Sequence, residues 1–247
     1  MDIEAPTVIA VRRERVFLVL CGFFLCAMTL LNVIGITRFI QLGPMQLAVG
    51  VLPYPLTFLC TDLVSELYGR ARANWLVTVG LIMNIFVIGC LALGNTLPPV
   101  GPKALPPWQV LHLSQDFILP NGQIVSGQVE LFLLIYSCTA GAVLASMLAY
   151  MAAQYCDVFL FHFWKDLTRG RHLWLRNNFS TLISQLVDSI MVISITFGAS
   201  FLAGNITLNQ IFVLMLSNYL FKFVVALADT IPFYLLVGWL KPYLDVK

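Results

Sequence analysis

The chain has 247 residues, of which 60% are hydrophobic and 11% charged, and its formal net charge is +2. About a quarter of the residues in soluble globular proteins are charged, so this composition excludes a soluble globular fold. The small net charge, without any block of like charges, also argues against nucleic acid as a partner. We expect a single integral membrane domain over residues 1–247.

Six apolar segments are long enough to cross the roughly 30 Å hydrocarbon core of a bilayer as helices. Lipid offers no partner to backbone polar groups, so each crossing must be a helix, and the runs are too long for barrel strands. We therefore predict an all-α, polytopic fold. Its six transmembrane helices are expected at about 16–37, 44–68, 73–97, 129–164, 178–203 and 208–240.

Basic residues predict the orientation of these helices, because Lys and Arg concentrate on the cytoplasmic side. With the N-terminus inside, the outer side holds only Arg38 and Lys103, and Lys222 lies within the sixth helix. The other eleven face inward: Arg12, Arg13, Arg15, Arg70, Arg72, Lys165, Arg169, Arg171, Arg176, Lys241 and Lys247. Both termini are thus predicted to be cytoplasmic, with the proline-rich loop 95–128 outside.

Two halves of three helices each follow from this topology. Three is odd, so the second half is inserted upside down relative to the first. Inverted repeats of this kind are typical of transporters, because they let one fold open alternately to either side.

The second apolar segment carries two acids, Asp62 and Glu66, one helical turn apart. A carboxylate at membrane depth is costly unless it faces a partner or a wet cavity. Asp62 lies about 12 Å along the axis from Arg70, too far for its short side chain to reach the interface. We interpret Asp62 as a site residue. Glu66 is either a cytoplasmic gate or an interfacial partner of Arg70 and Arg72.

Pro53 and Pro55 precede these acids, and each removes a backbone donor. We predict a break at Tyr54, with a helix restarting near Thr57.

The fifth segment repeats the pattern with Ser184, Gln185 and Asp188, which share one helical face at spacings of three and four. Asp188 is about ten residues from either end, so it is predicted near the bilayer centre. We interpret it as the carboxylate most in need of a functional explanation.

In the sixth segment Asn218, Lys222 and Asp229 also share a face. An ammonium at this depth needs a carboxylate, and either Asp188 or Asp229 could provide it. A helix-pairing salt bridge without any ligand contact remains an alternative.

Asn32 and Asn84, in the first and third segments, could belong to a site or pair neighbouring helices. Gln154 and Asp157, one turn apart near the cytoplasmic end of the fourth segment, could belong to a site or lie at the membrane interface. The six cysteines lie in apolar stretches and are interpreted as packing thiols, so we expect no disulfide and no metal site. No sequence motif of a hydrolase, P-loop or metalloenzyme is present. We therefore expect neither an enzyme nor a cofactor.

Three motifs, taken in order, resemble those of the queuosine precursor transporter family, also known as the vitamin uptake transporters: PLTFLCTDLVSELYG, QYCDVFLFHFWK and LWLRNNFSTLISQLVDS. Lys222 with downstream Pro232 adds to this resemblance, which extends from Arg12 to Tyr243. It implies a multi-pass protein of the bacterial inner membrane. It also implies import of 7-cyano- or 7-aminomethyl-7-deazaguanine, a base used to modify tRNA.

A guanine-like base presents an N1–H and an amino group side by side, which one carboxylate can accept as a bidentate pair. Asp188, Asp62 or Glu66 could play this role, with Lys222 keeping the carboxylates ionised or donating to the base. The side chains expected to help are Gln185, Asn84, Asn178 and Asn218. We predict alternating access around a site between the second, fifth and sixth segments.

Several alternatives stay open. The chain could instead be the substrate-binding subunit of a multi-component vitamin importer. Whether protons or sodium ions drive transport, and whether the protein works as a homodimer, are not decided by the sequence.

Overall fold

The computed structural model describes residues 6–34, 37–42, 45–101, 106–118, 124–202 and 207–246. Six helices dominate it, which confirms the predicted all-α class: α1 (Pro6–Val33), α2 (Tyr54–Tyr68), α3 (Arg70–Thr96), α4 (Leu131–Leu167), α5 (Leu173–Leu202) and α6 (Leu208–Tyr243). Within the described residues, four helices are long and apolar enough to cross a membrane, namely α1, α3, α5 and α6. The chain is a multi-pass membrane protein.

The second predicted helix, 44–68, is wrong as a continuous segment. Its first part is a strand, β2 (Met45–Ala48), which pairs antiparallel with β1 (Phe39–Leu42), and the short helix η1 (Val49–Val51) follows. Only the 15 residues of α2 are α-helical. At 1.5 Å per residue α2 spans roughly 22 Å, less than the hydrocarbon core. The predicted break is real, although α2 begins at Tyr54 rather than near Thr57.

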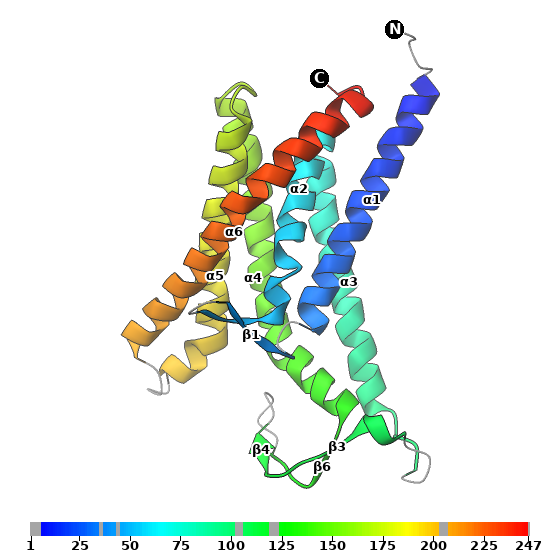
Figure 1. The fold of residues 1–247 in the computed structure, drawn as a ribbon, viewed down its shortest axis with the longest axis vertical. Coiled ribbons are helices and arrows are strands. Elements are labelled where there is room, and N and C mark those ends of the chain that lie inside the picture. The colour runs from blue at the N-terminus through cyan, green and yellow to red at the C-terminus, as the bar shows by residue number, and fades with distance from the viewer. Residues whose placement is uncertain are drawn as a thin grey trace.

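Short strands also occur in the segment between α3 and α4, which the sequence predicts only as a loop. After the turn η2 (Pro107–Gln109), β3 (Val110–His112) pairs with β6 (Gln128–Glu130), and β4 (Phe117–Ile118) pairs with β5 (Ile124–Val125). These strands lie beyond the ends of α3 and α4 (Figure 1). They therefore cap one end of the helical bundle.

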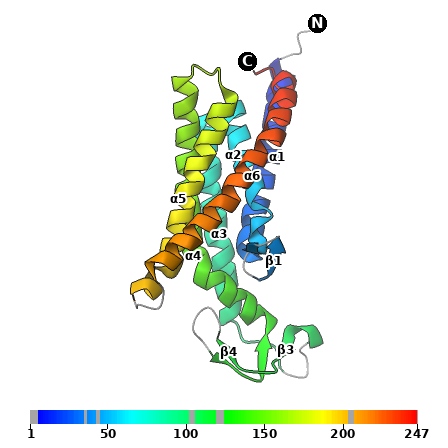
Figure 2. The same ribbon diagram turned by 60° about the vertical axis from the view of Figure 1, so that its left-hand side comes forward.

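The opposite end of the bundle carries both termini and the connection between α4 and α5 (Figures 1 and 2). We name it the basic end, because most of the predicted inward-facing Lys and Arg lie there. The turn from α2 into α3 is also at this end, and Gly69 makes it with a φ of 87°, which favours glycine. Of the residues used to predict orientation, Lys103 and Lys247 lie outside the described part of the chain.

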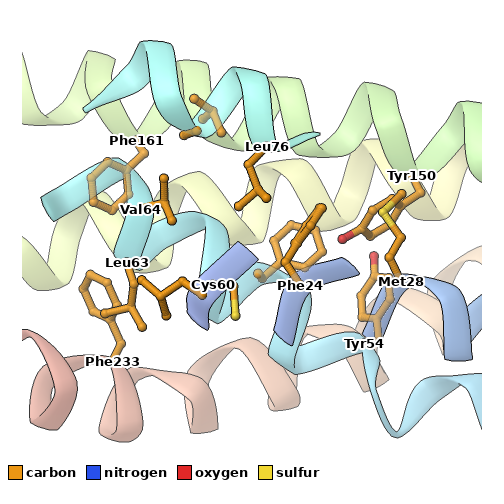
Figure 3. Close-up of a cluster of buried hydrophobic side chains, with 14 of the residues drawn as sticks. Phe24, Met28, Tyr54, Cys60, Leu63, Val64, Leu76, Tyr150, Phe161 and Phe233 are labelled. Carbon is orange, nitrogen blue, oxygen red and sulfur yellow. The ribbon is translucent and has the colours of Figure 1, made fainter. Parts of the chain in front are cut away.

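The apolar core surrounds α2, which packs on α1, α3, α4 and α6. Figure 3 shows Phe24 and Met28 from α1, Leu63 and Val64 from α2, and Phe161 and Phe233 from α4 and α6 meeting in one cluster. A fully buried Phe or Leu side chain contributes about 1.5–3 kcal/mol of transfer free energy. The short α2 is thus held at the centre of the bundle by its neighbours.

Candidate functional site

Helices α2 and α5 meet chiefly through polar side chains. Tyr54 contacts Asp188, Asp62 contacts Thr181, and Glu66 contacts Arg176. Residue numbers rise along α2 while those of the α5 partners fall, so the two helices run antiparallel. The contacts form three layers, which we name the Asp188 group, the acid pair and the Glu66 cluster.

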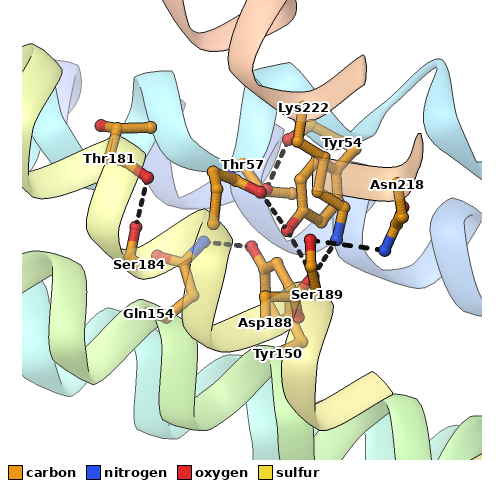
Figure 4. Close-up of polar contacts among 11 residues, drawn as sticks. Tyr54, Thr57, Tyr150, Gln154, Thr181, Ser184, Asp188, Ser189, Asn218 and Lys222 are labelled. Carbon is orange, nitrogen blue, oxygen red and sulfur yellow. Dashed lines mark hydrogen bonds and ion pairs between the residues drawn. The ribbon is translucent and has the colours of Figure 1, made fainter. Parts of the chain in front are cut away.

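The Asp188 group joins three helices around one carboxylate. The hydroxyl of Tyr54 lies 2.9 Å from Gln185 Oε1 and 3.0 Å from Asp188 Oδ2. Lys222 of α6 donates to the same Asp188 oxygen, and its Nζ lies 4.8 Å from the centre of the Tyr54 ring. Figure 4 shows Tyr54, Asp188 and Lys222 converging. The buried Asp188 carboxylate is therefore paired with the Lys222 ammonium, which offsets the cost of burying its charge.

Lys222 thus pairs with Asp188, one of the two partners that the sequence allows. The other, Asp229, lies farther along α6 and is half-buried. Asn218, one turn before Lys222, donates to Ser189 Oγ at 3.4 Å, so α5 and α6 are joined here as well. Of the nine residues predicted for the substrate site, the structure brings four together here: Gln185, Asp188, Asn218 and Lys222.

The acid pair consists of Asp62 of α2 and Asp157 of α4, whose carboxyl groups are in contact. Both are docked on one turn of α5, because Thr181 donates to Asp62 Oδ2 at 3.4 Å and Ser184 donates to Asp157 Oδ1 at 3.1 Å. Asp62 is 4% exposed and Asp157 0%. The sequence singles out both residues, but it does not show that they meet.

The Glu66 cluster closes the bundle towards the basic end. Three cations from three helices surround this buried carboxylate: Arg176 at 2.5 Å, Lys241 at 2.6 Å and Lys165 at 3.4 Å. Of the two alternatives left open for Glu66, the interfacial pairing with Arg70 and Arg72 does not match the structure. Arg70 lies over the Phe159 ring, and Arg72 pairs with Glu14.

Two other predicted site residues make helix-pairing bonds elsewhere. Asn84 of α3 accepts from Asn32 of α1 at 2.8 Å and donates to the Gly80 carbonyl at 2.9 Å. Asn178 accepts from Thr230 of α6 at 2.8 Å. Both side chains are buried, and their described contacts lie outside the three layers. The helix-pairing alternative considered for Asn84 matches this geometry.

Sequence reasoning misses the tyrosines. It marks Tyr54 only as the place of a helix break, and it does not single out Tyr150. Their rings stand edge to face, with centroids 5.8 Å apart, and Gln154 donates to the Tyr150 hydroxyl. The one available signal is the position of Tyr54 between two prolines at a helix start, which aims its side chain into the bundle.

Within each of the three layers the side chains contact one another directly. Cavities elsewhere are apolar in character: one of about 570 Å³ runs between α1, α2 and α6, and one of about 630 Å³ lies near Trp108 and Phe132. Neither is lined by the Asp188 group.

Ionisable side chains buried in layers at the centre of an all-helical, multi-pass bundle are typical of membrane transport proteins, in which such groups line substrate and ion pathways. A family model described as "Putative vitamin uptake transporter" matches residues 48–237. The chain belongs to this family, which confirms the resemblance found in the sequence.

A protein of Bacillus subtilis (strain 168) named "Probable queuosine precursor transporter" is 25% identical over 197 residues, covering 78% of this chain and 72% of the relative. No solved structure matches the chain.

Proposed function

We propose that the chain imports a queuosine precursor, 7-cyano- or 7-aminomethyl-7-deazaguanine, across the bacterial inner membrane into the cytoplasm. Its family and the name of the Bacillus subtilis relative support the substrate class. The Asp188 group is the proposed binding site, and both termini are proposed to be cytoplasmic at the basic end.

The carboxylate of Asp188 is the observation that carries the proposal. Its Oδ2 accepts hydrogen bonds from Lys222 and Tyr54. Its Oδ1 is buried without a hydrogen-bond partner in the described part of the chain. The N1–H and amino group of a deazaguanine are parallel donors that match two carboxylate oxygens. The base would thus supply the donor that Oδ1 lacks and compete with Tyr54 for Oδ2.

The surroundings of Asp188 fit the rest of a flat, polar base. The Tyr54 and Tyr150 rings offer apolar faces on which it can stack. The amides of Gln185 and Asn218 can read ring nitrogens and carbonyl oxygen. Lys222, released from Asp188 when the base binds, can donate to that carbonyl.

In our proposal, alternating access depends on the contacts between α2 and α5, the Tyr54–Asp188 hydrogen bond and the Glu66 cluster. In this proposal the antiparallel α2 and α5 occupy corresponding places in two inverted halves. The Glu66 cluster ties α2, α4, α5 and α6 together and closes the cytoplasmic side. Binding of the base breaks the Tyr54–Asp188 contact between α2 and α5, which frees the halves to rock about the site.

Uptake in a bacterium unable to make the precursor tests this function. Cells carrying the wild-type chain should take up labelled precursor and restore queuosine in tRNA, whereas Asp188→Asn and Lys222→Ala should not. Asp166→Asn, which removes an exposed acid of α4, is the matched control and should behave as wild type. Unchanged uptake in both site variants would contradict the assignment of the site.

A further inference from the structure

The acid pair differs from the other buried acids of the core in having no cation. Glu66 is surrounded by three basic side chains, and Asp188 is paired with Lys222. No Lys, Arg or His of the described chain forms an ion pair with Asp62 or Asp157, although both are at most 4% exposed. Two touching carboxylates at this depth cannot both be ionised, because their repulsion adds to the loss of hydration.

Hydrogen-bond donors are also too few for two carboxylates. Asp62 Oδ1 and Asp157 Oδ2 have no donor among the described residues. The hydroxyls that reach the other two oxygens are shared: Thr181 is also 2.9 Å from the Asn177 carbonyl, and Ser184 is 2.9 Å from the Thr181 carbonyl. Each hydroxyl has a single proton. One proton between the two acids would supply the missing donor.

We propose that Asp62 and Asp157 together bind one transported proton, held between their carboxyl groups, and that this proton crosses the membrane with the substrate. The charged groups facing the pair are the half-buried carboxyl of Asp229 on α6 and, one turn along α2, the neutralised Glu66. From α5 the hydroxyls of Thr181, Ser184 and Ser180 face it. The surroundings therefore favour a bound positive charge.

The pair is also linked to the Asp188 group, so the inference rests on the proposed function. Gln154 lies one turn before Asp157 on α4 and donates to Tyr150, whose ring packs against Tyr54. The Gln154 Oε1 is buried without a hydrogen-bond partner in the described chain. A base that displaces Tyr54 would shift Tyr150 and Gln154, and through them the contacts of Asp157.

Infrared spectroscopy of the purified protein tests the bound proton without any transport. We expect the carbonyl-stretch band of a protonated carboxyl group near neutral pH in the wild type and in Asp229→Asn, which removes the half-buried acid of α6. Added to Asp229→Asn, Asp62→Asn and Asp157→Asn should each abolish the band, because an asparagine amide donates to the remaining carboxylate. Asp166→Asn should keep the band. Its absence from the wild type, or its persistence in either pair variant that folds, would overturn the proposal.

Proteoliposomes test whether the proton moves with the substrate. An external pH about one unit more acidic than the lumen should support up to about tenfold accumulation of a neutral base in the wild type. Asp157→Asn should retain counterflow exchange but lose this accumulation, as should Asp62→Asn. Accumulation that follows a sodium gradient and ignores pH would overturn proton coupling. Wild type without any counterflow would refute the proposed function instead, leaving the infrared result to decide on the pair.

Discussion

The hydroxyl of Tyr54 in α2 lies 3.0 Å from the carboxylate of Asp188 in α5, although the two residues are 134 positions apart in the chain. It is the polar bridge between the two helices at the proposed substrate site. Lys222 meets the same carboxylate from α6, so a single oxygen atom connects three helices. Opening the site must break these contacts.

Tyr54→Phe should separate the stability of this bridge from substrate binding. Loss of the hydroxyl should lower the free energy of unfolding by about 1 kcal/mol. Precursor affinity should rise, up to about fivefold, because the base no longer competes with the hydroxyl for Asp188. Thermal unfolding in detergent and equilibrium binding measure the two effects, with Tyr234→Phe on the exposed side of α6 as control. Weaker binding would show that Tyr54 assists the base rather than competing with it.

Lys222→Met should leave the buried carboxylate of Asp188 without its cation and destabilise the protein by about 3–5 kcal/mol. Combining it with Asp188→Asn should recover most of the lost stability, since neither charge then remains. Transport should stay absent in the double variant. If the double variant were as unstable as Lys222→Met alone, the ion pair would not be the source of the loss.

Glu66→Gln should weaken the closure at the basic end. Arg176 is 3% exposed and would lose its counter-ion, at a cost of about 3 kcal/mol. Lys165 and Lys241 are about one-third exposed and contribute less. Glu14→Gln is the matched control, because its pair with Arg72 is exposed and should be worth less than about 1 kcal/mol. Equal losses in chemical unfolding of the two variants would show that Glu66 is not a tight connector.

Gly80→Ala should disturb the close packing of α1 on α3. A Cβ there would lie 2.7 Å from the Phe24 ring and 2.9 Å from the sulfur of Met28, beside the Asn32–Asn84 bond. Overpacking of this kind costs about 1–3 kcal/mol. Gly89→Ala in the same helix, where a Cβ meets nothing within 4 Å, should leave thermal stability unchanged or slightly higher. Equal stability of the two variants would contradict the tight contact.

Hydropathy predicts the long helices well, because length and apolar composition are local properties. Hydropathy gives the wrong prediction over 44–68, because strand β2 is apolar like the helix α2 that follows it. The segment is therefore predicted as one transmembrane helix. The Gly-Pro dipeptide at 43–44 is a turn signal that could have indicated the hairpin.

The site is predictable in part for a similar reason. Gln185 and Asp188 can be grouped because spacing along one helix fixes a shared face. The meeting of Asp62 with Asp157, and of Glu66 with Arg176, depends on which helices pack together, and spacing within a helix contains no such information. The role of Tyr54 is not predicted, because an aromatic residue in an apolar segment is normally interpreted as a core residue. Its polar role depends on the partners of its hydroxyl, Gln185 and Asp188, which only the structure shows.

Counterflow by the purified protein, reconstituted alone in liposomes, examines the proposed import itself and also excludes a multi-component importer. Liposomes loaded with unlabelled 7-cyano-7-deazaguanine should take up the labelled base. Asp188→Asn should reduce this exchange to the level of empty liposomes, while Asp166→Asn should exchange as the wild type does. Absence of exchange in the wild type, or full exchange in Asp188→Asn, would contradict transport through the Asp188 group.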